Sequence, residues 1–252
     1  LRDGRFILPN DNKVLGVGRT PAEVAAVLTA AGQSGDQINL EIQPMLLRDG
    51  ERVVLFDTGA GGHMGTEGRL IASLRAAGVA PDQVTDILLS HGHGDHVGGL
   101  VNASGGLVFP NAAVRMATPE WQALQANKDM AALVTAITPK VQTFQPGAQV
   151  LPNIAAVAVN GHAPGHTAYE ITSGDQGLLY IGDTAHHSVI SVQRPDWTIA
   201  YDEDAPTAEA SRKALLQRLA EKQTRIYAVH FPWPGLGHVT RQGEGLVWTP
   251  EA

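Results

Sequence analysis

Segments with helical periodicity alternate with short apolar runs along the chain. Residues 20–32 (TPAEVAAVLTAAG) are typical of an amphipathic helix, because the apolar side chains recur at helical spacing. Thr20 is placed as the N-cap, Glu23 completes a capping box, and Gly32 ends the helix. Further helical segments are predicted at 66–78, 118–137 and 205–222.

The apolar runs predict strands. Within 44–61, two strands are joined by the turn Asp49-Gly50. Other strands are expected at 84–90, 112–117, 141–159, 177–184 and 225–231. This order indicates an α/β (α+β) fold with two mixed sheets covered by helices. Because no internal repeat or linker interrupts the pattern, we expect residues 1–252 to form a single domain.

Four of the apolar strands end in a histidine or an aspartate. Polar groups from distant parts of a chain that meet at strand ends are typical of an active site built on a sheet. The four strands and the residues at which they end are Val53–Phe56 at Asp57, Ile87–Leu89 at His91, Leu178–Ile181 at Asp183, and Ile226–Val229 at His230.

The segment SHGHGDHVGG, which follows strand 84–90, holds three histidines and an aspartate. His91 and His93 are two residues apart in an extended turn and can bind one metal ion, whereas Asp95 and His96 point elsewhere and can bind a second. The chain has no cysteine, so imidazole and carboxylate are the available ligands, which suit Zn²⁺, Mn²⁺, Fe²⁺ or Co²⁺. A solvent-exposed histidine-rich loop is the alternative, but such a loop would not be expected to follow a buried strand so abruptly.

Composition limits the possible partners. The net charge of −7 and the lack of any Lys/Arg cluster argue against nucleic acid. No apolar run is long enough to cross a bilayer, so no membrane association is expected.

The spacing His91-x-His93-x-Asp95-His96 matches the HxHxDH signature of the metallo-β-lactamase superfamily. The other motifs of that family can be found in order. APGHT resembles the motif that supplies a third histidine, and its PGHT context favours His166 over His162. IGDT resembles the motif of a bridging carboxylate, Asp183, and AVHFPWPGLGH resembles the final motif, with His230 as ligand. Asp57 in LFDTGAG resembles the family's aspartate that orients the metal-binding histidines.

The resemblance implies a four-layer αβ/βα sandwich with two divalent metal ions at one edge, zinc first and manganese, iron or cobalt as alternatives. A hydroxide shared by the two ions would attack the substrate. The implied ligands are His91, His93 and His166 for one ion, Asp95, His96 and His230 for the other, and Asp183 between them.

The chemical roles that follow are assigned to Asp95, Asp183 and His186. His186 would contact the substrate or donate a proton to the leaving group, and a supporting role beside the metal ligands is an equal alternative. Thr167, Trp233 and Trp121 are expected beside the metals or along the substrate pocket. For Trp233, packing of a proline-rich loop is the alternative.

Within the superfamily, FDTGAGGHMG, HVGGL, GDTAHH and HFPWPGLGHV resemble most the methyl parathion hydrolase and lactonase branch. The implied substrate is a small neutral ester, an aryl phosphotriester (organophosphate) or a lactone. The alternative is a lactonase or carboxylesterase of the acyl-homoserine lactone type with only incidental phosphotriesterase activity. A non-catalytic metal-binding protein is a more distant alternative. The resemblance leaves room for a homodimer. The given sequence starts at Leu1, and members of the family are frequently exported. Together these two points favour a periplasmic or secreted protein over a cytoplasmic one.

Overall fold

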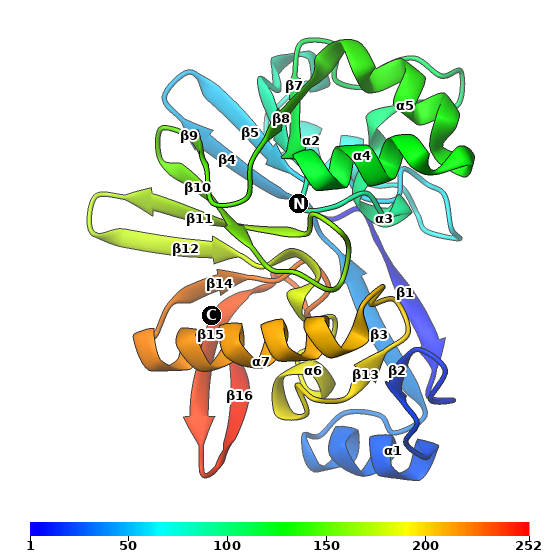
Figure 1. Cartoon of the computed structure of the whole chain (residues 1–252), viewed down its shortest axis with the longest axis vertical. Helices are drawn as coiled ribbons and strands as arrows, with labels where there is room; N and C mark the ends of the chain where they lie inside the picture. The colour runs from blue at the N-terminus through cyan, green and yellow to red at the C-terminus, as the bar shows by residue number, and fades with distance from the viewer. Residues whose placement is uncertain (252) are drawn as a thin grey trace.

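Two β-sheets stacked face to face form the centre of the molecule (Figure 1). The computed structural model describes residues 1–251. The first sheet has the strand order β4-β5-β6-β7-β8. Its strands are β4 (Met45–Asp49), β5 (Arg52–Phe56), β6 (Asp86–Leu88), β7 (Ala113–Ala117) and β8 (Val141–Phe144).

The second sheet has seven strands in the order β16-β15-β14-β12-β11-β10-β9. Both sheets combine parallel and antiparallel pairs, which confirms the prediction of two mixed sheets. The strands of the second sheet are β9 (Gln149–Leu151), β10 (Ile154–Ala158), β11 (Thr167–Ser173), β12 (Gln176–Tyr180), β14 (Arg225–Tyr227), β15 (Leu236–Gln242) and β16 (Gly245–Pro250).

Helices cover the outer faces of both sheets, which gives the four layers that the resemblance implies. Side chains of α2, α4 and α5 share a core with the first sheet, and those of α7 share a core with the second. A third core, with Phe56, Tyr169 and Tyr180, lies between the sheets. The helices are α1 (Pro21–Ala30), α2 (Leu70–Ala76), α3 (Gly94–Val97), α4 (Thr118–Ala126), α5 (Ala131–Ile137), α6 (Ile190–Gln193) and α7 (Ala205–Lys222). Single 3₁₀ turns are η1 (Pro81–Gln83), η2 (Gly98–Leu100), η3 (Lys128–Met130), η4 (Thr138–Lys140) and η5 (Gly182–Thr184).

The N-terminal residues form a two-stranded ribbon of β1 (Gly4–Pro9) and β3 (Gln37–Ile42), which the sequence pattern did not reveal. Phe6 pairs with Leu40 on one face of the ribbon, and this face packs onto α1. Ile7 lies on the opposite face and is exposed. A second small ribbon, β2 (Leu15–Val17) with β13 (Thr198–Ile199), lies in the same part of the molecule.

The predicted helix at the N-terminus is confirmed with its capping box, in which the Thr20 side chain accepts the N–H of Glu23. The helix predicted at 66–78 begins only at Leu70. Gly68, with φ at +64°, leaves no room for a side chain against Gly62, so the chain turns there. The helical region at 118–137 is interrupted at Asn127. Two strands that the apolar pattern did not predict, β15 and β16, follow the predicted strand at 225–231.

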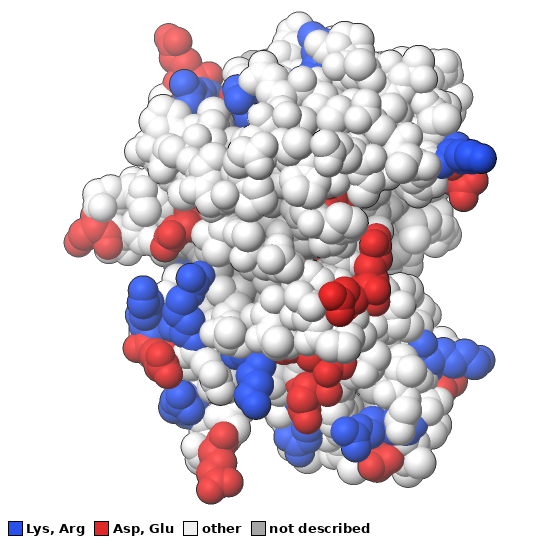
Figure 2. Space-filling view, viewed as in Figure 1, with Lys and Arg blue, Asp and Glu red and all other residues white. Residues whose placement is uncertain are grey.

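Among residues 1–251, no helix is long and apolar enough to cross a membrane. On the face shown in Figure 2, lysines and arginines are interspersed with aspartates and glutamates, and no broad surface of one sign is formed.

Candidate metal centre

The four predicted strand ends meet at one edge of the two sheets. β5 and β6 run parallel in the first sheet, and β12 and β14 run parallel in the second. The carboxyl ends of each pair therefore lie side by side. The loops that follow these strands carry His91, His96, Asp183 and His230, all of them almost fully buried.

Asp57 follows β5 with a φ of +56°, a backbone conformation that is unfavourable for a residue with a Cβ. Its carboxylate lies 2.7 Å from Nδ1 of His96 and accepts hydrogen bonds from Ser90 and from the hydroxyl of Tyr180, each at 2.7 Å. These contacts fix the His96 ring so that its Nε2 points to the site. Contacts of this kind are what the orienting role predicted for Asp57 would require.

Three histidines converge on one point, and we call them the three-histidine site: His91, His93 and His162. Nε2 of His162 lies 3.2 Å from Nε2 of His91 and 3.1 Å from Nδ1 of His93. A second group, which we call the aspartate site, consists of Asp95, His96 and His230. In this group the nearest oxygen of Asp95 is 3.6 Å from Nε2 of each histidine.

Asp183 lies between the two sites, with one oxygen toward each. Its Oδ2 is 3.4 Å from Nε2 of His162 and 3.8 Å from Nε2 of His91. Its Oδ1 is 3.3 Å from Nε2 of His96 and 3.1 Å from Nε2 of His230. A carboxylate in this position can be a ligand to an ion in each site.

The donor atoms fit metal ions. Two ligand atoms of one tetrahedral zinc ion, each about 2.0–2.2 Å from it, lie roughly 3.3 Å apart, and the distances within the two sites are of this size. Nε2 of His96 and Oδ1 of Asp183 are buried without a hydrogen-bond partner among the described residues. Buried polar atoms without a partner are costly unless they bind something.

His166 is not part of either site, which corrects the prediction. Its Nε2 accepts the backbone N–H of Asp183 at 2.9 Å, so its Nδ1 carries the proton and donates to the carbonyl of Val159 at 3.0 Å. Both ring nitrogens are thus used, and none is left for a metal. His162, four residues earlier, occupies the expected place. The sequence indicates the pair His162-x₃-His166, but its PGHT context favours the histidine whose two nitrogens are both hydrogen-bonded in the fold.

A buried ion pair of Asp202 and Arg212 contacts the imidazole of His162 on the side away from the three-histidine site. Nδ1 of His162 is 2.9 Å from Asp202, whose other oxygen is 3.2 Å from the guanidinium of Arg212 on α7. Arg212 also donates to the carbonyls of Pro195 and Trp197. No feature of the sequence pointed to this pair, because its two members belong to different elements and meet only in the fold.

The ionisation of the cluster is set by burial and by the surrounding charges. Burial lowers the pKa of His162 to about 3, against the opposing effect of Asp202, and that of His166 to about 4. Burial would raise the pKa of Asp183, but His230 and the neighbouring histidines hold it well below its usual range. In the three-histidine site the imidazoles are therefore neutral and Asp183 is ionised, which are the forms that bind divalent ions. In the aspartate site, Asp183 and Asp95 raise the pKa of His96 and of His230 despite their burial, so binding of a metal ion there would release protons.

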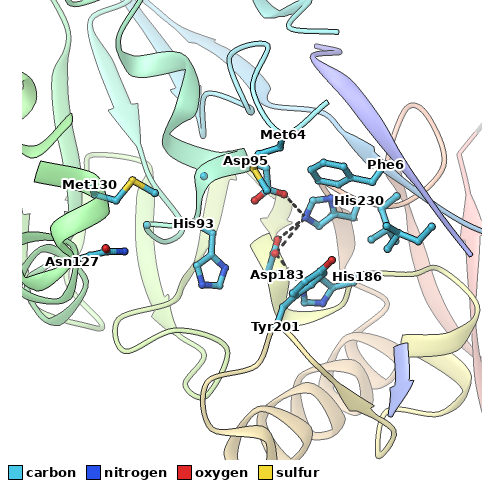
Figure 3. Close-up of a pocket in the computed structure, with 14 residues that line it drawn as sticks. Phe6, Met64, His93, Asp95, Asn127, Met130, Asp183, His186, Tyr201 and His230 are labelled. Atoms are coloured by element: carbon cyan, nitrogen blue, oxygen red, sulfur yellow. Dashed lines mark hydrogen bonds and ion pairs between the residues drawn. The ribbon is translucent and has the colours of Figure 1, made fainter. Parts of the chain in front are cut away.

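A cavity of about 350 Å³ opens onto the two sites (Figure 3). His93, Asp95, Asp183, His186 and His230 line its polar floor. The walls are largely apolar and come from distant segments: Phe6, Leu8 and Leu40 from the N-terminal ribbon, Met64, and Met130 with Asn127 near η3. Tyr201, which the sequence analysis did not single out, also lines the cavity.

His186 lies on the floor of this cavity. Its ring stacks on His230 with an interplanar angle of 7°, and its Nε2 is 3.1 Å from Oδ2 of Asp183. Neither ring nitrogen makes a hydrogen bond with the described residues. Nε2 faces the Asp183 carboxylate, and Nδ1 is the ring nitrogen without a protein partner nearby among the described residues.

The predicted pocket residues lie elsewhere. Trp121 packs against the core under the first sheet, and Trp233 is 54% exposed on the surface. Neither lines the cavity, so the prediction for both is corrected. Aromatic residues beside a site motif are equally suited to packing, and the sequence could not tell the two roles apart. Thr167 is buried, and its hydroxyl donates to the carbonyl of Gly165, so it supports the loop that carries His162.

Residues 42–246 match the metallo-beta-lactamase superfamily, and the chain belongs to that family. Among curated proteins, it is 27% identical over 239 residues to an N-acyl homoserine lactonase of Bacillus cereus, with 86% of this chain and 88% of the relative covered.

Two solved structures are similar over the whole chain. The dizinc quorum-quenching lactonase AidC, in complex with the product N-hexanoyl-L-homoserine, has a TM-score of 0.92 at 32% identity, and 92% of it is covered. The hydrolase AbOPH of the beta lactamase superfamily has a TM-score of 0.89 at 28% identity, and 93% of it is covered.

Proposed function

We propose that this chain is a metal-dependent hydrolase that opens the ring of N-acyl homoserine lactones. The observation that carries the proposal is the pair of ligand sites sharing Asp183 on the floor of a cavity with apolar walls. The similarity to AidC and to the Bacillus cereus lactonase supports it. Of the two substrates implied by the sequence, the lactone is favoured over the phosphotriester.

The metal ions are proposed to be zinc, as in the dizinc relative. The three-histidine site would hold one ion, the aspartate site the other, and Asp183 both. When bound, two such ions would lower the pKa of a water molecule and would favour negative charge on the ester carbonyl oxygen. In the reaction, water adds its oxygen to the carbonyl carbon, the bond from that carbon to the ring oxygen breaks, and the ring oxygen takes up a proton.

The residues of the chain supply binding and proton transfer. Asp95 has the most exposed side chain of the aspartate site, at 13%. The side chains of His96, His230 and Asp183 are more deeply buried. Asp95 is placed to take a proton from the attacking water and return it to the ring oxygen. His186 lines the cavity beside Asp183, and we propose that its imidazole donates a hydrogen bond to the substrate.

The apolar walls suit the acyl chain. Phe6, Leu8 and Leu40 line one side of the cavity, and Met64 and Met130 also contribute. A volume of about 350 Å³ lies within the range of small-molecule pockets. The polar floor would take the lactone ring and the ribbon side the acyl tail.

The test compares kcat/KM of zinc-loaded protein for N-hexanoyl-homoserine lactone and for an aryl phosphotriester. We expect the lactone to be preferred by 100-fold or more, about 2.7 kcal/mol in transition-state binding. Chelator-treated protein is the control and should be inactive on both. A phosphotriester preference, or no turnover of either with both metals bound, would refute the lactonase assignment.

A further inference from the structure

Glu120, in the first turn of α4, is a buried carboxylate that is not used by the proposed chemistry. Its residue is 3% exposed. Oε1 accepts the backbone N–H of Gly92 at 2.7 Å, and Oε2 accepts the backbone N–H of Gly165 at 2.8 Å. Within residues 1–251, it forms no ion pair with a lysine, arginine or histidine.

The two glycines belong to the two loops that build the three-histidine site. Gly92 stands between His91 and His93, and Gly165 follows His162 by three residues. Glu120 therefore joins with one side chain two loops that are about 70 positions apart in sequence. All three histidine ligands of this site are carried by the loops that it joins.

The close approach of the His162 loop to α4 requires a glycine at position 165, and position 92 is also tightly packed against Glu120. A Cβ on Gly165 would lie 2.5 Å from the backbone nitrogen of Glu120 and 2.8 Å from its Cβ, too close for any real side chain. A Cβ on Gly92 would lie 3.1 Å from Oε1. The loop of His162 thus lies too close to α4 for any side chain at position 165.

Placing a carboxylate in the interior without a cation is unfavourable, because the charge loses its hydration. Two charge-assisted hydrogen bonds from backbone N–H groups offset part of this cost. For packing alone, an apolar side chain of similar size would be the less costly choice. A buried carboxylate at position 120 is explained if the loops of Gly92 and Gly165 must be kept at a fixed distance from each other.

We propose that Glu120 is a positioning residue that sets the geometry of the three-histidine site and thereby its metal affinity. The proposal rests on the metal pair of the proposed function. A second link between the loops, from the backbone N–H of Thr167 to the carbonyl of Ser90 at 2.9 Å, does not involve Glu120. A variant at Glu120 is therefore expected to keep the fold while the ligands move apart.

The test is the substitution Glu120→Gln, which keeps the shape but turns an amide N–H₂ toward one of the two backbone N–H groups. Zinc affinity is measured on the holoenzyme by competition with a chromophoric chelator, with circular dichroism as the check on folding. We expect the dissociation constant of one of the two ions to rise about 10- to 100-fold and that of the other to stay the same, as for other residues that orient metal ligands.

Asp3→Asn is the matched control, because Asp3 is also a buried carboxylate that accepts two backbone N–H groups, those of Ala60 and Leu70. It should cost a comparable amount of stability and leave both zinc affinities unchanged. An equal loss of zinc in both variants would overturn the proposal, as would unchanged zinc binding in Glu120→Gln.

The background His162→Ala identifies the site. If Glu120 acts on the three-histidine site, adding Glu120→Gln to His162→Ala should not change the dissociation constant of the one zinc ion that remains. A further loss of that ion would contradict the proposal. These zinc measurements require no turnover. A native protein that binds two zinc ions but hydrolyses no lactone would refute the proposed substrate and leave the role of Glu120 intact.

Discussion

Hydrogen bonds to the ring nitrogens determine that His162, and not His166, is available as a metal ligand. An imidazole can bind a metal only through a nitrogen with a free lone pair. In His166 that lone pair accepts the N–H of Asp183, and the other nitrogen donates to a carbonyl. In His162, Nδ1 faces Asp202, and Nε2 is left pointing at His91 and His93.

The first prediction follows from this difference. His162→Ala should lower the zinc content of the dialysed protein from two ions to one, because the three-histidine site loses a ligand. His166→Ala should keep two ions and lose stability, since it leaves the N–H of Asp183 without an acceptor. Zinc content is measured by atomic emission after dialysis. Loss of an ion in His166→Ala with two ions kept in His162→Ala would restore the ligand set predicted from the sequence.

The second prediction concerns His187, which is buried and whose Nδ1 accepts the N–H groups of Val189 and Ile190. Burial lowers its pKa from 6.5 to about 4. Between these two values the unfolded chain binds a proton that the folded chain does not, so His187 makes the folded state less stable as the pH falls from 6.5 to 4. The full effect is on the order of 3 kcal/mol.

His187→Asn keeps an acceptor and removes the titration. Urea unfolding of both proteins at several pH values measures the effect. The free energy of unfolding of the native protein minus that of the variant should decrease as the pH falls from 7 toward 4. A difference that stays constant over this range would show that His187 is not the group responsible.

At the scale of elements, the N-terminal ribbon supplies one wall of the cavity. Strand alternation places Phe6 and Leu8 toward the cavity and Ile7 on the opposite face. In the proposed function the ribbon would contribute to substrate binding without supplying a metal ligand. It is joined to the rest of the fold by the core around α1.

The third prediction uses this alternation and the proposed substrate. Phe6→Ala should raise KM for a lactone with a long acyl chain about tenfold, the loss of roughly 1.4 kcal/mol of apolar contact, with little change for a butyryl lactone. Ile7→Ala, one residue away on the outer face, is the matched control and should change neither. Steady-state kinetics over a series of chain lengths measures both. An equal effect of Phe6→Ala on all chain lengths would place the acyl chain elsewhere.

At the scale of the whole molecule, the two sheets each provide part of the metal centre. His91, His93, Asp95 and His96 follow a strand of the first sheet, while His162, Asp183 and His230 belong to loops of the second. Ions held between them would connect the two halves of the sandwich. Their binding energy would therefore contribute to global stability.

The fourth prediction is that metal removal lowers the melting temperature. An ion present at 100 times its dissociation constant stabilises the folded state by about 2.7 kcal/mol, so two ions should shift Tm by on the order of 10 °C. Differential scanning calorimetry of zinc-loaded and chelator-treated protein measures the shift. Recovery of the original Tm on adding zinc is the control. Equal melting temperatures would mean that the ions bind the folded and unfolded chain alike or not at all.

The sequence by itself determined what local pattern and composition can specify. The capping box of Thr20 and Glu23 involves neighbouring residues, so the start of α1 could be predicted. Apolar runs that end in His or Asp specified four strand ends, and HxHxDH placed four candidate ligands in one short segment. These are interactions of residues close in sequence, or motifs with a fixed spacing.

The tertiary structure decided what depends on partners from distant segments. Whether His162 or His166 faces the site is set by Asp202, Arg212 and the backbone of Asp183, none of which lies within the motif. The apolar wall formed by Phe6 and the bond of Glu120 to two loops likewise exist only when elements far apart in the chain pack together. The sequence does not show whether the lone pair of a histidine nitrogen is available to a metal ion. That depends on the hydrogen bonds that the imidazole makes in the folded protein.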